Sequence, residues 1–221
     1  MIQHHPQDDM LLAHAAGNLA AGPALLVASH IEQCAVCRER MAFLDVVGGA
    51  YLDALTPAML APDAFARTLS AIDALDGKVS ESAAKVARRP SFPALPAGAT
   101  WPKAFDGCIV TPWRWLGPGM RWSRVMLPHD SAANVFLLRI GAGKKLPQHT
   151  HSEIELTQVM YGSFDDGRSV FGAGDFDEAD GSIHHQPVVH AQSECICLAS
   201  VQGRVIFKGA VARTLGALVG M

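Results

Sequence analysis

The apolar residues of this chain change their spacing on either side of a proline-rich segment at residues 85–102. Before this segment they recur every three or four positions, as in amphipathic helices. After it they form short runs rich in Val, Ile, Phe and Trp. Helices and strands place side chains with different periods, so one uniform fold cannot accommodate both parts. The pattern predicts a multidomain α + β protein, with a helical domain at 1–78, a linker at 79–100 and an all-β domain at 101–221.

The first domain is expected to be a small bundle of about four helices. Pro23 suits the first turn of the second helix, and Gly77 is expected just after the end of the last. The predicted helical stretches are 8–20, 22–34, 37–55 and 61–77. In the second domain, short strands separated by Gly, Pro, Asp and Asn predict a β-sandwich or barrel. The predicted strands are 108–116, 120–127, 133–140, 154–164, 194–201 and 203–209.

Charge and composition narrow the possible functions. The net charge of −3 gives no reason to expect nucleic-acid binding. Residues 1–78 carry nine acidic and four basic residues, a net charge of −5. This acidity suits a basic protein partner, although a solvated acidic surface would explain it equally well.

The beginning of the chain does not resemble a signal peptide, because two aspartates and no basic residue precede the first apolar stretch. Residues 10–31 lack charged side chains, but Gly22 and Pro23 interrupt them, so no membrane span is expected. The sequence therefore predicts a cytoplasmic protein. Five cysteines are few and odd in number, which favours metal ligands or core thiols over disulfides.

The stretch HIEQCAVC at residues 30–37 is a candidate metal site. In a continuous helix, His30, Cys34 and Cys37 would share one face. Zinc in a structural site takes four Cys or His ligands, and a small domain gains stability from such a metal. His4 and His5 are the candidates for the fourth ligand. The alternative is a pair of buried thiols beside a surface histidine.

A second candidate site lies in the β domain. His149, His151 and Glu155 are spaced so that one strand would present all three on one face. Two imidazoles and a carboxylate can bind a divalent metal. Glu153 has the same parity and is expected to be solvated. A further histidine should come from residues 184–185, where adjacent strand positions face opposite ways, so only one of the two can bind.

These motifs carry a family resemblance. Gly143, the three residues His149, His151 and Glu155, and Gly162 match the spacing of the first cupin motif. The short helical domain with HxxxCxxC resembles the zinc-binding anti-sigma domain, whose CxxC lies near a helix junction, so the helix is expected to bend there. The combination, with its proline-rich linker, resembles ChrR-type anti-sigma factors over essentially the whole chain.

The resemblance implies a function and a set of ligands. The helices would clasp an extracytoplasmic-function sigma factor and inhibit it, without contact to nucleic acid or membrane. The cupin would be needed for the response to singlet oxygen or oxidative stress. Zinc is implied in the helical domain, and a second divalent metal, expected to be zinc, in the cupin. The implied ligands are His5, His30, Cys34 and Cys37 in the helical domain, and His149, His151, Glu155 and His185 in the cupin.

The alternative function is a metal-dependent cupin enzyme, a dioxygenase or an isomerase, because such enzymes use the same ligand types. A stand-alone cupin enzyme has no need of the helical motif, so we expect a protein that is not an enzyme. Cys195 and Cys197 share a strand face and are interpreted as core thiols, with oxidation sensing as the alternative. The four tryptophans are interpreted as packing residues.

Overall fold

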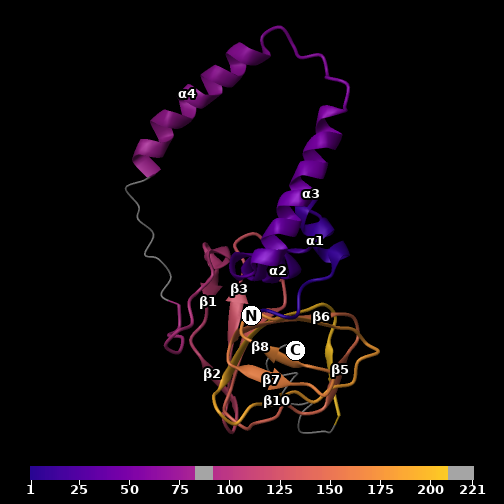
Figure 1. Cartoon of the computed structure of the whole chain (residues 1–221). Coiled ribbons are helices and arrows are strands. Elements are labelled where there is room, and N and C mark those ends of the chain that lie inside the picture. The colour runs from indigo at the N-terminus through magenta and orange to yellow at the C-terminus, as the bar shows by residue number, and fades with distance from the viewer. Residues whose placement is uncertain (83–91, 209–221) are drawn as a thin grey trace.

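The computed structural model describes residues 1–82 and 92–208 and confirms the predicted class, four helices followed by a cupin-like β domain (Figure 1). The helices are α1 (Asp8–Ala15), α2 (Ala21–Gln33), α3 (Ala35–Asp53) and α4 (Ala64–Ser82). The prediction that the last helix ends before Gly77 is wrong, because Gly77 lies inside α4. A helix tolerates an interior glycine at a cost of about 1 kcal/mol. The central part of the predicted linker, 83–91, lies outside the described residues.

A short 3₁₀ turn, η1 (Lys103–Phe105), leads into the β domain. Its strands are β1 (Ile109–Val110), β2 (Arg114–Gly117), β3 (Met120–Met126), β4 (Val135–Ile140), β5 (His149–His151), β6 (Glu155–Tyr161), β7 (Ser163–Asp165), β8 (Val170–Gly172), β9 (Phe176–Ala179), β10 (Val188–Val189), β11 (Cys195–Val201) and β12 (Val205–Phe207). The large sheet has the order β1-β3-β4-β11-β6-β9, with β2 beside β3. Two small antiparallel sheets, β10-β7-β8 and β12-β5, complete the barrel.

Strand β11 shows how one sheet serves two cores. All seven of its residues are buried, because both faces of the sheet are covered. Ile196 and Leu198 belong to the cluster that contains the helix residues Leu25 and Leu26. Cys197, between them, points to the other face and packs inside the barrel. The period of two along β11 therefore directs one set of side chains to the helices and the other to the barrel interior.

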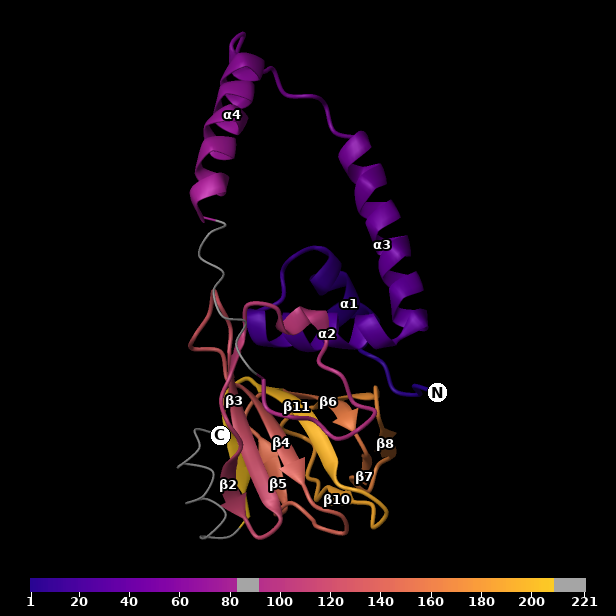
Figure 2. The same ribbon diagram turned by 90° about the vertical axis from the view of Figure 1, so that its left-hand side faces the viewer.

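Helix α2 lies across the outer face of the large sheet, with α1 above it (Figure 2). Gly22 allows this close approach, because a Cβ there would lie 2.5 Å from the side-chain oxygen of Ser200. Glu32, near the end of α2, accepts hydrogen bonds from the backbone N–H groups of Lys103 and Ala104 at 2.8 and 2.6 Å. The helices and the barrel are thus joined by packing as well as by the chain.

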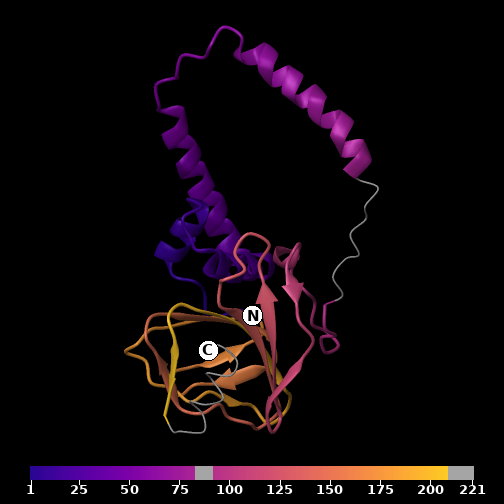
Figure 3. The ribbon, with the colours of Figure 1, turned by 180° about the vertical axis from the view of Figure 1, so that it is seen from behind.

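The end of α3, the following loop and α4 project away from the barrel (Figures 1 and 3). Large apolar side chains remain exposed there, and Phe43 and Phe65 are 67% and 77% accessible. We call this set the open apolar surface: Phe43, Val46, Tyr51, Leu52, Leu55, Met59, Leu60, Phe65, Leu69, Ile72 and Leu75. The four helices do not all pack on one another, since α1, α2 and the first half of α3 form the packed part.

The first residues of the chain run beside β9, the last strand of the large sheet. The backbone N–H groups of Gln3 and His4 donate to the carboxylate of Asp175, and the carbonyl of His4 accepts from Phe176 N–H. This segment covers a sheet edge that would otherwise expose unpaired backbone groups. No helix within residues 1–82 and 92–208 is both long and apolar enough to cross a membrane.

Candidate metal centres

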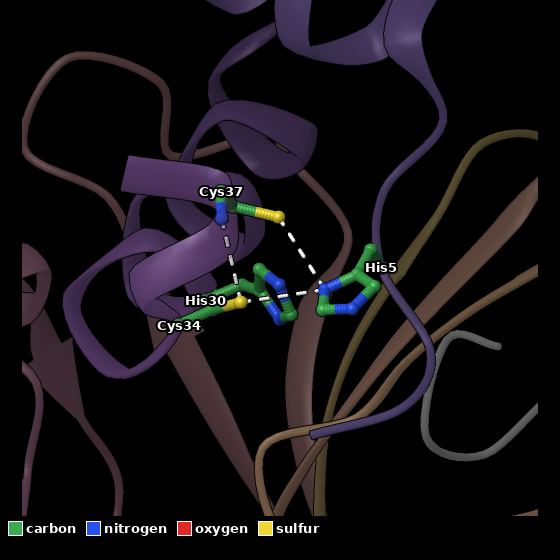
Figure 4. Close-up of side chains that lie close together, drawn as sticks. All are labelled: His5, His30, Cys34 and Cys37. Atoms are coloured by element: carbon green, nitrogen blue, oxygen red, sulfur yellow. Dashed lines mark hydrogen bonds between the residues drawn. The ribbon is translucent and has the colours of Figure 1, made fainter. Parts of the chain in front are cut away.

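The structure brings His5, His30, Cys34 and Cys37 together in one cluster (Figure 4). One potential ligand atom from each residue lies within 4.8 Å of the others. The Nδ1 atom of His5 is 3.3 Å from Cys34 Sγ and 3.5 Å from Cys37 Sγ. His5 comes from the N-terminal segment, His30 from α2, and the cysteines from the start of α3. Two imidazoles and two sulfurs are a donor set that suits tetrahedral zinc.

The cysteines do not lie on one continuous helix with His30. Helix α2 ends at Gln33, and Cys34 has extended dihedral angles (φ −105°, ψ 110°) before α3 begins at Ala35. The assumption of an unbroken helix is therefore wrong, whereas the bend expected from the family resemblance is present. Cys34 Sγ accepts a hydrogen bond from Cys37 N–H at 3.5 Å and caps α3. With this break, both sulfurs lie next to His5 Nδ1.

His30 is oriented by the barrel. Its Nδ1–H donates to the carbonyl of Gly174 at 2.9 Å, which leaves the lone pair of Nε2 directed at the cluster. This Nε2 is buried and has no hydrogen-bond partner. Burial also lowers the pKa of His30 to about 4, so the ring stays neutral. A buried lone pair without a partner costs free energy unless a cation accepts it, and a metal ion fits this position.

The thiols point to the same conclusion. Burial, with a contribution from neighbouring Cys34, raises the pKa of Cys37 to about 12. Two sulfurs held this close and away from water ionise only beside positive charge. Zinc supplies that charge and binds thiolates. His4, the rival candidate, lies outside the cluster and stacks against Phe171 with ring centroids 4.5 Å apart.

A second cluster lies inside the barrel and contains the buried residues His149, His151, Glu155 and His185. The Nε2 atom of His185 is 3.0 Å from His149 Nε2 and 3.3 Å from His151 Nε2. The nearest carboxylate oxygen of Glu155 is 3.2 Å from His151 Nε2 and 3.9 Å from His149 Nε2. Four donor atoms thus converge on one small volume.

These four residues come from three segments, so the prediction of a single strand is wrong. His149 and His151 lie on β5, which pairs with β12, whereas Glu155 begins β6 in the large sheet. Residues 152–154 form a bend between the two strands. The bend closes the barrel and turns Glu155 toward the histidines. Glu153, at the bend, is exposed.

His185 belongs to the cluster, and its neighbour His184 is exposed. The backbones of His185 and His149 form an isolated antiparallel bridge, with N–H···O distances of 3.1 Å in both directions. This bridge holds the two rings together, with centroids 4.5 Å apart. Because adjacent residues of an extended chain face opposite ways, His184 points away from the site.

Two histidine nitrogens of the cupin cluster face each other in a way that requires a positive charge between them. His149 Nδ1–H donates to the carbonyl of Pro147 at 2.8 Å, and His185 Nδ1–H donates to Asp166 at 3.3 Å. Their Nε2 atoms therefore direct lone pairs at each other across 3.0 Å. Such a contact is repulsive unless a proton or a metal ion lies between the rings. Burial alone would lower the pKa of His149, but the carboxylate of Glu155 outweighs it and raises this pKa.

Comparisons with known proteins identify the family. A family model described as the ChrR cupin-like domain matches residues 108–203. The chain is 36% identical over 206 residues to the anti-sigma-E factor ChrR of Cereibacter sphaeroides, which covers 93% of this chain and 92% of that protein. This chain belongs to the ChrR family. The crystal structure of Rhodobacter sphaeroides SigE in complex with the anti-sigma ChrR matches with a TM-score of 0.68 and 32% identity, covering 91% of this chain and 100% of that chain.

This ChrR family member also has an ion network, with two buried aspartates and one partly exposed arginine, that its sequence did not predict. Arg168 donates hydrogen bonds to Asp166, at 2.7 Å from its Nε, and to Asp177, at 2.7 Å from Nη2. Asp166 in turn accepts from His185, so the network holds one histidine of the cupin cluster in place. Asp166 and Arg168 lie at the β7–β8 turn, but Asp177 comes from β9. Sequence spacing contains no signal for a contact between the turn of one sheet and a strand of another.

The other cysteines and tryptophans considered in the sequence lie outside the two clusters. Cys195 and Cys197 are buried on β11, with their sulfurs 3.6 Å apart, and pack in the barrel core of this ChrR family member. Trp101 packs between Phe92 and Phe105. Trp115, by contrast, is 70% exposed, so the prediction that it is a packing residue is wrong. It lies on β2, which pairs with β3, and none of the described residues covers its side chain.

Proposed function

We propose that this chain is an anti-sigma factor. Its helices would bind an extracytoplasmic-function sigma factor and keep it from RNA polymerase, and its cupin would control release under oxidative stress. The family supports this function, since a relative that matches 93% of this chain is an anti-sigma factor. The similar solved structure is that of a sigma factor in complex with its anti-sigma factor. Such a partner acts in the cytoplasm, where we place this protein.

The observation that carries the proposal is the open apolar surface. Phe65, Leu69 and Ile72 are spaced so that they form one stripe along α4, and all three are exposed. A helix with such a stripe normally buries it, and a large exposed apolar patch marks a binding surface. Helices α3 and α4 stand apart from the barrel, as a clasp around a helical partner requires (Figure 1). The net charge of −5 over residues 1–78 suits a basic partner.

The helical cluster would hold zinc through His5, His30, Cys34 and Cys37. The metal would bind the N-terminal segment, through His5, to the junction of α2 and α3. The chain's own contribution is orientation: the Gly174 carbonyl fixes the His30 ring, and the start of α3 presents both sulfurs. We expect the first half of α3 to keep its direction only while this tie is intact, so sigma binding depends on it.

The cupin cluster would hold a second divalent metal, with zinc as the expected ion. Its role would be to respond to singlet oxygen or to related oxidants. An enzymatic role, as a dioxygenase or isomerase, is the weaker candidate, because the relative matched over nearly the whole chain is a regulator. The cupin residues are separated from the open apolar surface, so they would affect the sigma factor through the helices rather than by contact.

The proposal is tested by isolating the affinity-tagged, full-length chain from its own cells and identifying the sigma factor that is bound. The variant Phe65→Asp with Ile72→Asp is expected to weaken that complex by about thirtyfold or more, because buried apolar anchors dominate such interfaces. Binding is measured by titration of the purified sigma factor.

Ser70→Asp with Ala74→Asp is the matched control. Both residues are exposed and lie on the opposite side of α4 from Phe65 and Ile72, so this variant adds the same two negative charges to the same helix. Its complex should resemble that of the unmodified chain. The proposal is wrong if no sigma factor accompanies the chain, or if the stripe variant and the control bind it equally well.

A further inference from the structure

The barrel contains a partly open cavity of about 90 Å³ that reaches the cupin cluster. Its walls are mainly apolar and come from both the large sheet and the small ones. Its lining includes the apolar residues Met120, Leu138 and Ala199 and the polar residues His149, Glu155 and His185. Three of these six are members of the candidate metal cluster, so the cavity and the cluster form one site.

The polar residues that line the cavity are few. They are His149, Glu155, Thr157, Asp177 and His185, whereas residues such as Met120 and Leu138 form the apolar wall. A site with an apolar wall and a few converging polar groups is typical of small-molecule binding. The arrangement suits a ligand with one oxygen or nitrogen donor and an alkyl remainder.

Charge defines the ligand further. Among residues 1–82 and 92–208, no Lys or Arg lines the cavity. The buried carboxylates in and beside it are Glu155, Asp166 and Asp177, and Arg168 binds the last two. A dication in the cluster would therefore balance the remaining negative charge. A carboxylate ligand would add an unbalanced charge in a place of low polarity, which is costly, so the ligand should be neutral.

The volume of the cavity limits the size of the ligand. A cavity of roughly 150 Å³ holds benzene, so about 90 Å³ accommodates a molecule of about four or five heavy atoms. Drug-sized ligands need roughly 300 Å³ or more. Sugars of the kind bound by other β-barrels are too large and too polar for these walls.

We infer that the cavity beside His149, Glu155 and His185 is a binding site for small, neutral, alkyl-bearing molecules with a single oxygen donor, such as short-chain alcohols or ketones. The inference rests on the proposed metal function of the cupin cluster for the position of the donor atom. It adds to that function a chemical class of ligand through which the cupin could be regulated.

Met120 offers a direct reporter, because its side chain lines the cavity. Zinc-loaded, full-length protein labelled at the methionine methyl groups is titrated with n-butanol and followed by NMR. The Met120 signal is expected to shift and saturate. Met160, buried in the other core between sheet and helices, is the internal control and should not move. Butyrate, which has the same chain length and a negative charge, should bind at least about tenfold more weakly.

Two substitutions test the location. Ala199→Val narrows the cavity and should weaken n-butanol binding by about tenfold, because overpacked sites lose their space for a ligand. Leu138→Ala enlarges the cavity and should admit n-hexanol, which the unmodified chain should exclude. If Ala199→Val fails to fold, the n-hexanol comparison decides alone.

The possible failures are distinguishable. A zinc-loaded protein whose Met120 signal ignores n-butanol, or responds equally to butyrate, overturns the inference. Metal analysis of the same samples tests the proposed function separately. If the cupin binds no metal, the proposed metal role fails, while the response of Met120 still decides whether the cavity takes a neutral ligand.

Discussion

His30 of α2 donates a hydrogen bond from Nδ1 to the carbonyl of Gly174, 144 positions later in the chain, at 2.9 Å. This contact joins a candidate zinc ligand to the turn before β9. Phe176 on β9 packs edge-on against the same imidazole, with ring centroids 5.7 Å apart. The helical cluster is therefore partly assembled by the barrel, and a displacement of β9 would reach it directly.

Gly174→Ala should weaken metal binding at the helical cluster. Gly174 has φ of 91°, and a Cβ there would lie 2.6 Å from the side chain of Ile2. The substitution should displace the N-terminal segment and loosen the hydrogen bond to His30. Loss of such support typically costs about ten- to a hundredfold in metal affinity. Competition with a zinc chelator measures the effect.

Gly172→Ala is the matched control for this experiment. Gly172 lies two residues earlier, at the end of β8, but its added Cβ would meet only the Asp175 side chain at an ordinary distance of 3.8 Å. Its metal affinity should stay within about twofold of the unmodified chain. Equal losses in the two variants would show that the contact of Gly174 with His30 does not support the site.

Cys37→Ala should remove the helical metal. The unmodified chain is expected to contain about two metal ions, and the variant about one, since a site that closes on folding needs its full ligand set. The thermal midpoint should also fall, because His30 Nε2 loses the partner that a metal supplies. Elemental analysis and calorimetry give the two readings.

Cys108→Ala serves as the control, because Cys108 is a buried thiol outside both clusters. It should lower stability modestly through the lost side-chain volume while leaving the metal content unchanged. A full metal complement in Cys37→Ala would mean that the two cysteines are only packing residues.

Much of both clusters was predictable because ligand spacing is local. His149 and His151 are two positions apart on one strand and therefore share a face. Cys34 and Cys37 are three positions apart at the start of a helix and therefore lie close together. The sequence alone brings each pair together. The break at Cys34 and the bend before Glu155 were harder to predict. Both depend on how a segment closes against distant parts of the chain, which a local period does not contain.

The partner of α4 could not be predicted from its period either. Phe65, Leu69 and Ile72 indicate a face that will be buried, but the same pattern arises whether the covering surface is this chain or another molecule. The ion network of Asp166 and Arg168 with Asp177 was missed for a related reason. It joins the β7–β8 hairpin to strand β9 of the large sheet, and only the folded topology brings them into contact.

Arg168→Met should destabilise the barrel by about 2 kcal/mol, less than the loss of a fully buried ion pair, because the Arg168 side chain is 34% exposed. Burial raises the pKa of Asp177 from 3.8 to about 6, and Arg168 opposes that rise. Without Arg168 the pKa of Asp177 should increase further. A folded pKa above the unfolded one means that stability falls as pH rises toward the folded pKa.

The loss in Arg168→Met should therefore be smaller near about pH 5, where Asp177 can be protonated, than near about pH 8. Urea unfolding at both values gives the measurement. Arg121→Met, which removes an exposed arginine on β3, should show no such difference. A loss in Arg168→Met that is independent of pH would mean that the ionised Asp177 does not depend on Arg168.

The adjacent histidines of the cupin separate metal binding from sigma binding. His185→Ala removes a ligand atom that lies 3.0 Å from His149 Nε2, and it should abolish the cupin metal. His184→Ala changes an exposed side chain one position away and should behave like the unmodified chain.

Both variants keep the helical cluster intact, so both should still repress the sigma factor in unstressed cells. Under singlet oxygen from a photosensitiser, a sigma-dependent reporter should respond with His184→Ala and stay silent with His185→Ala. Normal induction in the His185 variant would exclude the cupin metal from sensing.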